Sequence, residues 1–327
     1  MVDVMIFAPS PLLTVTIEDD ADGADLHVHA GGQGVWQARM LRTLGRSVSI
    51  CAALTGETGQ VVRNLLEHDG VEVHAVEREG RGAAYVHDRR SGERRAVAEL
   101  PGDALSRHDL DELYAVVLRE AMTAELVLLS GPSDDGILPD DVYRRLAADL
   151  SAAGKSVVVD LAGSRLTAAL QGGVRLAKVS EAELRAAGGV KDTSVPELIA
   201  AARRLRDAGA ASVVVSRAGH PTVVVDGDRA FAVRVPRMEE VDSRGAGDSF
   251  TAALASALVD GVELQSAVGL GVAAGALNVT RHGLGTGDAE AIRRMSAQVE
   301  VQEIGADDAR RVTPDQLAAR TEEVDGR

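Results

Sequence analysis

Short runs of β-branched residues, each followed by a helical stretch, most restrict the fold of this chain. The runs SVVVD (156–160) and ASVVVS (211–216) are apolar almost throughout, which is typical of strands buried on both faces of a parallel sheet. Strand–helix alternation of this kind covers roughly 300 residues, and 45% of the 327 residues are hydrophobic, enough for a large core. The sequence therefore predicts an α/β fold, with a doubly wound, mostly parallel sheet and helices on both faces.

Two pairs of less apolar runs interrupt this alternation. Apolar and polar residues alternate in LLTVTIE (12–18) and DLHVHA (25–30), as in a pair of half-exposed strands. A hairpin is predicted where AAYVHD and ERRAVAEL flank the turn 89–92. We expect these strands, at about 11–31 and 82–100, to form a small β lid. The main domain then covers 1–299, and 300–327 is a polar tail, either an appended helix or disordered.

Composition excludes several kinds of partner and location. The net charge is −15 and aromatic residues make up 2%, so we expect neither the basic face nor the stacking platforms that bind nucleic acid. The only cysteine, Cys51, excludes a disulfide framework and favours a reducing, cytoplasmic setting. The N-terminus lacks a signal-peptide pattern and no apolar run reaches about 18 residues, so no membrane association is expected.

The stretch 240–261 carries the strongest functional signal. Its glycine turn, Gly245-Ala246-Gly247, opens a helix whose apolar residues recur at helical spacing. Backbone N–H groups in such a turn, with a helix N-terminus behind them, form an anion site suited to phosphate. A carboxylate beside it, Asp248, suits a general base that removes a proton from an attacking hydroxyl. Alternatively, Asp248 is an ordinary acidic residue in a first helical turn.

This stretch resembles the signature D-T-x-G-A-G-D of the ribokinase/phosphofructokinase-B sugar kinases, most closely the branch of 1-phosphofructokinases and tagatose-6-phosphate kinases. The matches are Asp242, Gly245, Ala246, Gly247 and Asp248, and Ser243 replaces the threonine. The resemblance extends from Met5 to about Met295. It implies that Asp248 is the base and that the backbone of 245–247 stabilises the transferring phosphoryl group.

The resemblance also implies where the acceptor binds. AGGQGVWQAR (30–39) is similar to the family's A-G-G-K-G-x-N-x-A-R, with Gln33 for lysine and Trp36 for asparagine. Thr14 stands where the family has an aspartate that binds sugar hydroxyls, and Arg81 where it has a phosphate-binding arginine. The implied substrate-binding residues are Thr14, Gly31, Gly32, Gln33, Trp36, Arg39, Arg81 and Asp248. A core position for Trp36 is the alternative.

ATP and Mg²⁺ are implied in the same way. KVSEAE (178–183) resembles K-P-N-x-x-E, and Glu183 is a candidate for holding Mg²⁺ through water, or else a solvated helix residue. SRAGHP (216–221) resembles the nucleotide loop S-x-G-x-x-G, with Ala218 and Pro221 in place of its two glycines. The implied nucleotide-binding residues are Lys178, Ser216, Gly219, Ser243, Asn278 and Gly283. Relatives bind a monovalent cation beside the signature turn, and nothing in this sequence decides that point.

These patterns predict ATP-dependent phosphotransfer to a hydroxyl of a sugar or sugar phosphate. One alternative is a nucleoside or other small-alcohol kinase of the same fold, which would use the same Asp248. Another is a catalytically silent ligand-binding relative. An intact Asp248 opposes it, and the replacements at Gln33, Trp36, Ser180 and Pro221 favour it. A homodimer through the lid is also allowed.

Overall fold

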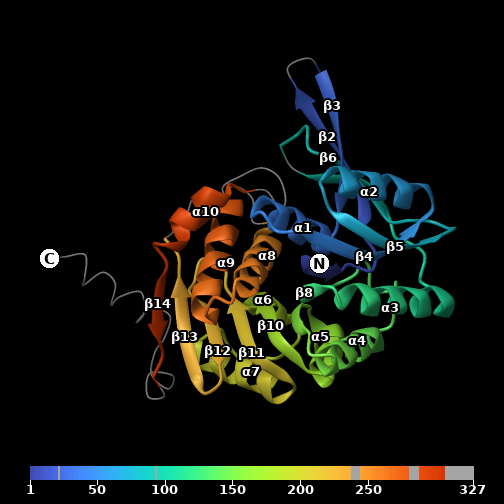
Figure 1. Cartoon of the computed structure of the whole chain (residues 1–327). Coiled ribbons are helices and arrows are strands. Elements are labelled where there is room, and N and C mark those ends of the chain that lie inside the picture. The colour runs from blue at the N-terminus through green and yellow to red at the C-terminus, as the bar shows by residue number, and fades with distance from the viewer. Residues whose placement is uncertain (21–22, 93, 237–243, 280–286, 306–327) are drawn as a thin grey trace.

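A ten-stranded sheet forms the centre of the computed structural model, which describes residues 1–20, 23–92, 94–236, 244–279 and 287–305 (Figure 1). Seven neighbouring strands of this sheet (β5, β4, β1, β8, β9, β10 and β11 in spatial order) pair in parallel. The strands beyond β11, at that edge of the sheet, pair antiparallel. The predicted doubly wound, mostly parallel sheet is confirmed. In spatial order the strands are β14 (Glu300–Glu303), β13 (Arg229–Arg234), β12 (Thr222–Asp226), β11 (Ala210–Ser216), β10 (Val174–Ser180), β9 (Ser156–Asp160), β8 (Ala124–Ser130), β1 (Val2–Phe7), β4 (Val48–Thr55) and β5 (Glu72–Arg78).

Helices cover both faces of this sheet because alternate side chains of each buried strand point to opposite sides. In β1, Val4 and Ile6 pack with one helical layer, whereas Met5 and Phe7 pack with the other. The first layer contains α1 (Gln33–Thr43), α2 (Gly56–His68), α8 (Ala246–Val259) and α9 (Leu264–Asn278), with α10 (Ala289–Ser296) packed on α9. The second contains α3 (Arg107–Ala121), α4 (Asp141–Ala152), α5 (Gly163–Gly172) and α7 (Val195–Asp207). The short α6 (Glu181–Ala186) directly follows β10.

The small second sheet projects from the top of the molecule in Figure 1, as the lid runs predicted. Its strands, in spatial order, are β3 (Gly23–Gly31), β2 (Leu12–Asp20), β6 (Ala84–Asp88) and β7 (Arg95–Leu100). The β2–β6 pair is parallel and the other two pairs are antiparallel. The register places the buried Thr14 and Thr16 on one face, together with Tyr85 and His87.

The C-terminal boundary differs from the expectation of a polar tail beginning at 300. Residues Glu300–Glu303 instead form β14, which pairs antiparallel with β13 at the edge of the main sheet. Strand pairing uses backbone hydrogen bonds, so exposed polar side chains do not prevent it at an edge. Arg229 strengthens the pair through hydrogen bonds to the Glu303 carboxylate at 2.9 and 3.0 Å. The rest of the expected tail, 306–327, lies outside the described residues.

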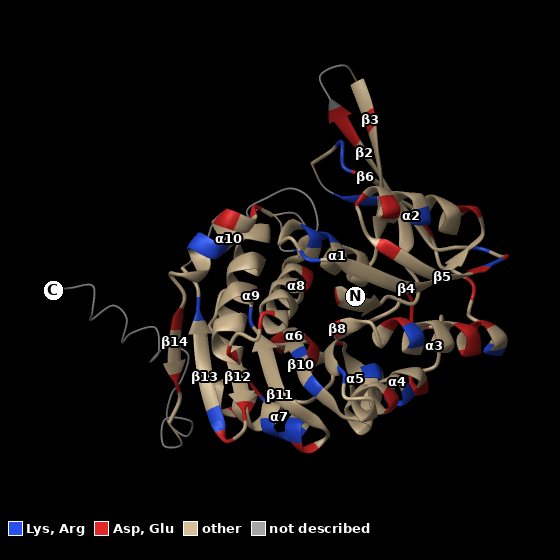
Figure 2. Cartoon of the chain, viewed as in Figure 1, with Lys and Arg blue, Asp and Glu red and all other residues tan. Residues whose placement is uncertain are grey.

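Basic and acidic residues are interspersed over α3, α4 and α7 in Figure 2. Among the described residues, no helix has both the length and the apolar character that crossing a membrane requires.

Candidate active site

The glycine turn before α8 has the backbone geometry expected of an anion site. Gly245 is the N-cap of α8 and has φ 71°, a left-handed conformation that favours glycine. Its carbonyl accepts the first helical hydrogen bond, from Ser249 N at 2.8 Å. Ala246 and Gly247 therefore form the first turn, where backbone N–H groups lack partners within the helix and favour an anion. Asp248 lies in the same turn.

Asn278, an expected nucleotide-binding residue, holds this turn in place. Its side-chain amide nitrogen donates to the carbonyl oxygen of Arg244 at 2.7 Å, and its amide oxygen accepts from Ser249 Oγ at 3.1 Å. The side chain is buried, at 1% exposure. Both ends of the amide are thus engaged inside the protein, which indicates a structural role for Asn278.

Asp248 is the most strongly perturbed carboxyl group near the turn. Burial raises its pKa from 3.8 to about 7, the charges of Asp160 and Glu183 add to the rise, and that of Lys178 opposes it. A carboxyl with a pKa near neutrality binds and releases a proton readily, which is the property required of a general base at physiological pH.

Lys178, at the end of β10, lies directly beneath the turn. A Cβ atom at Gly247 would lie 3.2 Å from its Nζ, so glycine at this position permits the close approach of the ammonium. Burial lowers the pKa of Lys178, but the negative charges of Asp160, Glu183 and Asp248 outweigh it and hold the pKa above its ordinary value. The turn is thus backed by a fixed positive charge, which favours a phosphate group still further.

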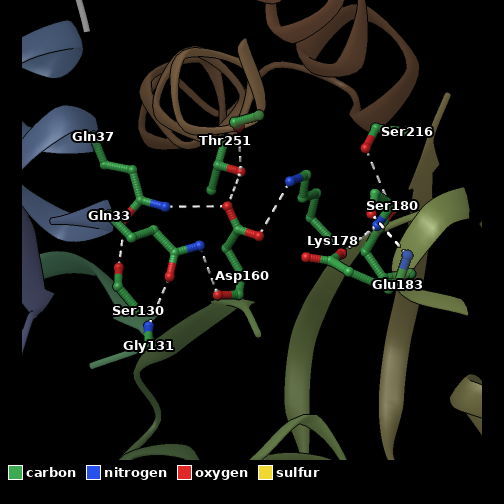
Figure 3. Close-up of polar contacts among 12 residues, drawn as sticks. Gln33, Gln37, Ser130, Gly131, Asp160, Lys178, Ser180, Glu183, Ser216 and Thr251 are labelled. Atoms are coloured by element: carbon green, nitrogen blue, oxygen red, sulfur yellow. Dashed lines mark hydrogen bonds and ion pairs between the residues drawn. The ribbon is translucent and has the colours of Figure 1, made fainter. Parts of the chain in front are cut away.

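Asp160, at the end of β9, joins Lys178 to two helices on the same side of the sheet (Figure 3). Its Oδ1 accepts from Lys178 Nζ at 3.1 Å. Its Oδ2 accepts from Thr251 Oγ1 at 2.6 Å and from Gln37 Nε2 at 3.1 Å. Gln37 in turn accepts a hydrogen bond from Ser130 Oγ, at the end of β8.

The sequence motifs did not point to Asp160, Thr251, Gln37 or Ser130. A signal for Asp160 was present, because SVVVD (156–160) ends an apolar run in a single carboxylate. In open α/β sheets, ligands bind beyond the carboxyl ends of the strands, so a polar residue at that point is a candidate for the site. No comparable signal marks Gln37, which lies within a helix.

The three replaced acceptor positions do not share one environment. Gln33 is engaged at both ends, donating to the Asp160 carbonyl at 3.1 Å and accepting from Gly131 N at 2.8 Å. Thr14 and Trp36 lie together, since a Cβ at Gly31 would be 2.5 Å from Thr14 Oγ1 and 3.3 Å from the Trp36 ring. Trp36 is 7% exposed and packs 5.4 Å from the His29 ring. Most of its surface therefore belongs to the core.

The two arginines expected to bind an anionic group already have carboxylate partners. Arg39 pairs with Asp69 at 2.9 Å and lies over the Trp36 ring, 5.0 Å from its centroid. Arg81 pairs with Asp103 at 3.3 Å, and its side chain is 59% exposed. Exposed pairs of this kind contribute about 1 kcal/mol or less, so a phosphate could displace the carboxylate from Arg81.

A small cavity lies beneath the lid, beside the loop that follows β1 and the junction of β4 with α2. Its polar lining includes Ser10, Thr55, Thr58 and Asp103. A Cβ at Gly32, the N-cap of α1, would lie 3.7 Å from Pro11, another residue of the lining. The cavity therefore adjoins the expected acceptor loop, between it and Asp103.

Sequence comparison decides the family, with a match to the pfkB family of carbohydrate kinases over residues 8–291. The chain belongs to this family. As a pfkB-family member it is an enzyme, a sugar kinase that transfers a phosphoryl group to an alcohol group. The expected family and the expected sugar-kinase activity are confirmed.

Curated relatives cover most of this pfkB-family chain. It is 30% identical to the ATP-dependent 6-phosphofructokinase isozyme 2 of Escherichia coli, over 77% of this chain and 82% of the relative. It is 26% identical to the 1-phosphofructokinase of Bacillus subtilis, over 84% and 88% respectively.

Solved structures of phosphofructokinases resemble this chain over most of its length. Phosphofructokinase-2 from Escherichia coli in complex with potassium has a TM-score of 0.79 at 26% identity, covering 91% of this chain and 99% of that one. The same enzyme in complex with fructose-6-phosphate has a TM-score of 0.77 with the same identity and coverage.

The residues of this kinase fit Mg²⁺ as a companion of ATP rather than as a separate protein-bound ion. Glu183 Oε2 accepts from Ser180 N at 2.7 Å in a capping box that begins α6, which leaves its second oxygen available. The described residues contain no group of three acidic, histidine or cysteine side chains placed to hold a metal. Mg²⁺ commonly uses only one or two carboxylates together with substrate phosphates, so this sparse donor set is compatible with it.

The expected nucleotide loop begins where β11 ends. Ser216 Oγ lies 3.5 Å from the carbonyl of Val179, and Gly219 has φ 68° in the turn that follows. Two further expected nucleotide-binding residues, Ser243 and Gly283, and the signature residue Asp242 lie outside the described residues.

Proposed function

We propose that this kinase transfers the γ-phosphoryl group of ATP to a hydroxyl of a phosphorylated or otherwise anionic sugar, with Asp248 as the general base. The observation that carries the proposal is the position of Asp248, in the first turn of α8 behind Gly245 and in the field of the Lys178 ammonium. A carboxylate beside an anion site repels phosphate, so it serves binding poorly and proton removal well.

In this proposal the other groups of the turn stabilise charge. The backbone N–H groups of Gly245, Ala246 and Gly247, with the positive end of the α8 dipole, receive the oxygens of the transferring phosphoryl group. Lys178 supports them from below, where it lies beside Gly247. Because phosphoryl transfer depends mainly on positioning and charge stabilisation, fixed groups of this kind supply most of what is required.

The class of acceptor follows from which of the family's acceptor-binding residues this chain keeps and which it replaces. The relatives are named for fructose phosphates, and Arg81 and Arg39 remain as cations for an anionic group. Thr14 and Trp36, however, stand where the family has an aspartate and an asparagine that contact the sugar. We infer an anionic sugar-like acceptor, bound beneath the lid, that lies against the accessible edge of Trp36 and differs from fructose 1-phosphate and fructose 6-phosphate.

Mg²⁺ accompanies ATP in this proposal, and Glu183 orients it through water from its free carboxylate oxygen. When bound, the ion neutralises phosphate charge during transfer. A monovalent cation beside the signature turn would be consistent with the potassium complex of phosphofructokinase-2 from Escherichia coli.

The deciding experiment measures ADP release with ATP and Mg²⁺ against hexoses, pentoses, nucleosides and hexose phosphates, using the wild type and Asp248→Asn. Turnover with an anionic sugar that the variant abolishes supports the proposal. Preference for a nucleoside would identify a nucleoside kinase of the same fold. ATP binding without turnover on any acceptor would identify a silent ligand-binding relative.

We also propose a homodimer formed through the lid. The strand register places Leu26, Val28 and Leu100 on one face of the small sheet, and each of these side chains is more than 40% exposed. Burial of such a face against its copy would remove apolar area from water. Light scattering of the wild type and of Leu26→Asp/Val28→Asp tests this: a dimer that becomes a monomer supports the proposal, and a monomeric wild type contradicts it.

A further inference from the structure

The carboxylate of Asp160 accepts hydrogen bonds from three different elements. Lys178 in β10, Gln37 in α1 and Thr251 in α8 each donate to it, at 3.1, 3.1 and 2.6 Å. The Asp160 side chain is 2% exposed and that of Lys178 is 5% exposed. A buried carboxylate with donors on both oxygens is held in position, and it holds the donors in turn.

The position of Lys178 is the one that matters for chemistry. Its Nζ lies beside Gly247, within the turn proposed to hold the transferring phosphoryl group. The ammonium of a lysine sits on a flexible four-carbon chain, so it needs a partner to be held at one point. Among the described residues, Asp160 forms an ion pair with Lys178, with 3.1 Å between its Oδ1 and the lysine Nζ.

We propose that Asp160 is a positioning residue for phosphoryl transfer, holding the Lys178 ammonium beneath the Gly245–Gly247 turn. This inference rests on the proposed kinase function. Asp160 itself does not contact the reacting atoms in this arrangement, because Gln37, Thr251 and Lys178 occupy its oxygens. Its contribution reaches the reaction through Lys178.

Thr251 links Asp160 to the turn a second time. Its hydroxyl donates to Asp160 Oδ2 and also lies 3.0 Å from the carbonyl oxygen of Gly247, one helical turn earlier in α8. Displacement of Asp160 would therefore disturb both the ammonium and the backbone above it. Gln37 fixes the opposite side of the same carboxylate oxygen and is itself held by Ser130.

The arrangement has an electrostatic consequence for the base. Within the described part of the chain, three charged groups act on Asp248: Asp160 and Glu183 raise its pKa, and Lys178 lowers it. Neutralising Asp160 removes one source of the rise, so the pKa of Asp248 should fall. Loss of packing alone would not shift this titration in a defined direction.

The test is a double-mutant cycle in the full-length protein with ATP, Mg²⁺ and the best acceptor from the panel. Asp160→Asn and Lys178→Met should each lower kcat, by about 10- to 100-fold and about 100- to 1000-fold, because a preorganised charge is lost or misplaced. The double variant should be no slower than Lys178→Met, since Asp160 acts through that lysine. The acidic limb of the pH profile should move to lower pH in Asp160→Asn.

Two controls separate positioning from folding. Asp3→Asn removes a carboxylate that accepts from Ser47 N and Ser47 Oγ at 2.7 and 2.8 Å, at the amino end of β1, and should leave kcat unchanged. Thr251→Val should lower kcat more than Thr251→Ser, which keeps the hydroxyl. Melting temperatures of all variants identify any that fail to fold.

The outcomes are distinguishable. A folded Asp160→Asn with kcat within twofold of wild type overturns the inference, as does a double variant whose losses multiply. If Asp160→Asn does not fold, the comparison of Thr251→Val with Thr251→Ser decides: equal kcat values overturn the inference. A wild type without turnover on any acceptor removes the proposed function, and the inference with it.

Discussion

The side-chain amide of Asn278 donates to the carbonyl oxygen of Arg244 at 2.7 Å, so the end of α9 holds the residue that precedes the phosphate turn. Close packing of α8 on α9 makes this contact possible. Cβ atoms at Gly271 and Gly275 would lie 3.0 Å from the carbonyl oxygens of Phe250 and Ala246. The glycines of α9 thus allow the approach of α8 and, through it, the geometry of the turn.

We expect Gly271→Ala to destabilise the protein because its Cβ would press on the Phe250 backbone and, at 3.2 Å, on the Phe250 ring. Overpacking of a close helix contact typically costs about 1–3 kcal/mol. Gly269→Ala is the matched control in the same helix, since its Cβ would meet Val299 at 3.6 Å, an ordinary contact. Thermal unfolding measures both, and equal melting temperatures would contradict the proposed tight packing.

Asp248→Asn should keep the fold and ATP binding but nearly abolish transfer. The amide is close to isosteric and cannot accept the proton, and a general base typically contributes about 10²–10⁴-fold to the rate. Steady-state ADP release gives kcat, and calorimetry gives ATP affinity. A kcat within tenfold of wild type would remove Asp248 from the role of base.

The activity should rise with pH through about pH 7. Asp248 must be deprotonated to act, and burial, aided by Asp160 and Glu183, raises its pKa from 3.8 to about 7. Below that pH, kcat/KM should fall about tenfold per pH unit. A profile that stays flat between about pH 5.5 and 8 would contradict this assignment.

The raised pKa of Asp248 also makes the stability of the fold depend on pH. Folded protein binds this proton more tightly than the unfolded chain does, so protonated Asp248 favours folding. Its contribution is complete below pH 3.8 and is lost as the pH rises to about 7. Asp248→Asn should therefore flatten the pH dependence of the melting temperature in that interval.

Transfer should require Mg²⁺ or Mn²⁺, and EDTA should abolish it, because a hard divalent ion accompanies the triphosphate. Glu183→Gln should raise the Mg²⁺ concentration needed for half-maximal activity more than it raises the acceptor KM. Glutamine can still accept the capping hydrogen bond from Ser180 N. Ser180→Ala is the control, since it weakens the cap but keeps the carboxylate; an equal effect on Mg²⁺ dependence would assign Glu183 to the cap alone.

Fructose 1-phosphate and fructose 6-phosphate should be weak acceptors. Each lost buried hydrogen bond typically costs about 1–3 kcal/mol, and Thr14 and Trp36 both replace family groups that contact the sugar. Trp36→Asn should improve kcat/KM for these sugars, whereas Arg81→Ala should raise KM for anionic acceptors. A wild-type kcat/KM near 10⁵ M⁻¹s⁻¹ or above for either fructose phosphate would contradict this reading.

The sequence by itself determined the sheet, its helical layers and the small second sheet, because apolar periodicity follows directly from burial on one or two faces. It also identified the turn before α8, since glycine spacing and an adjacent carboxylate are local features. Strand β14 was missed because edge pairing depends on backbone groups that every residue carries.

Only the tertiary structure decided which polar groups meet. Asp160, Lys178 and Thr251 lie far apart in the sequence, and the parallel register and the packing of α8 bring them into contact. Other tertiary contacts engage Gln33 and Asn278 inside the protein, which no local pattern could reveal. A hydrogen bond between distant residues depends on three-dimensional distance, whereas sequence motifs record only neighbours along the chain.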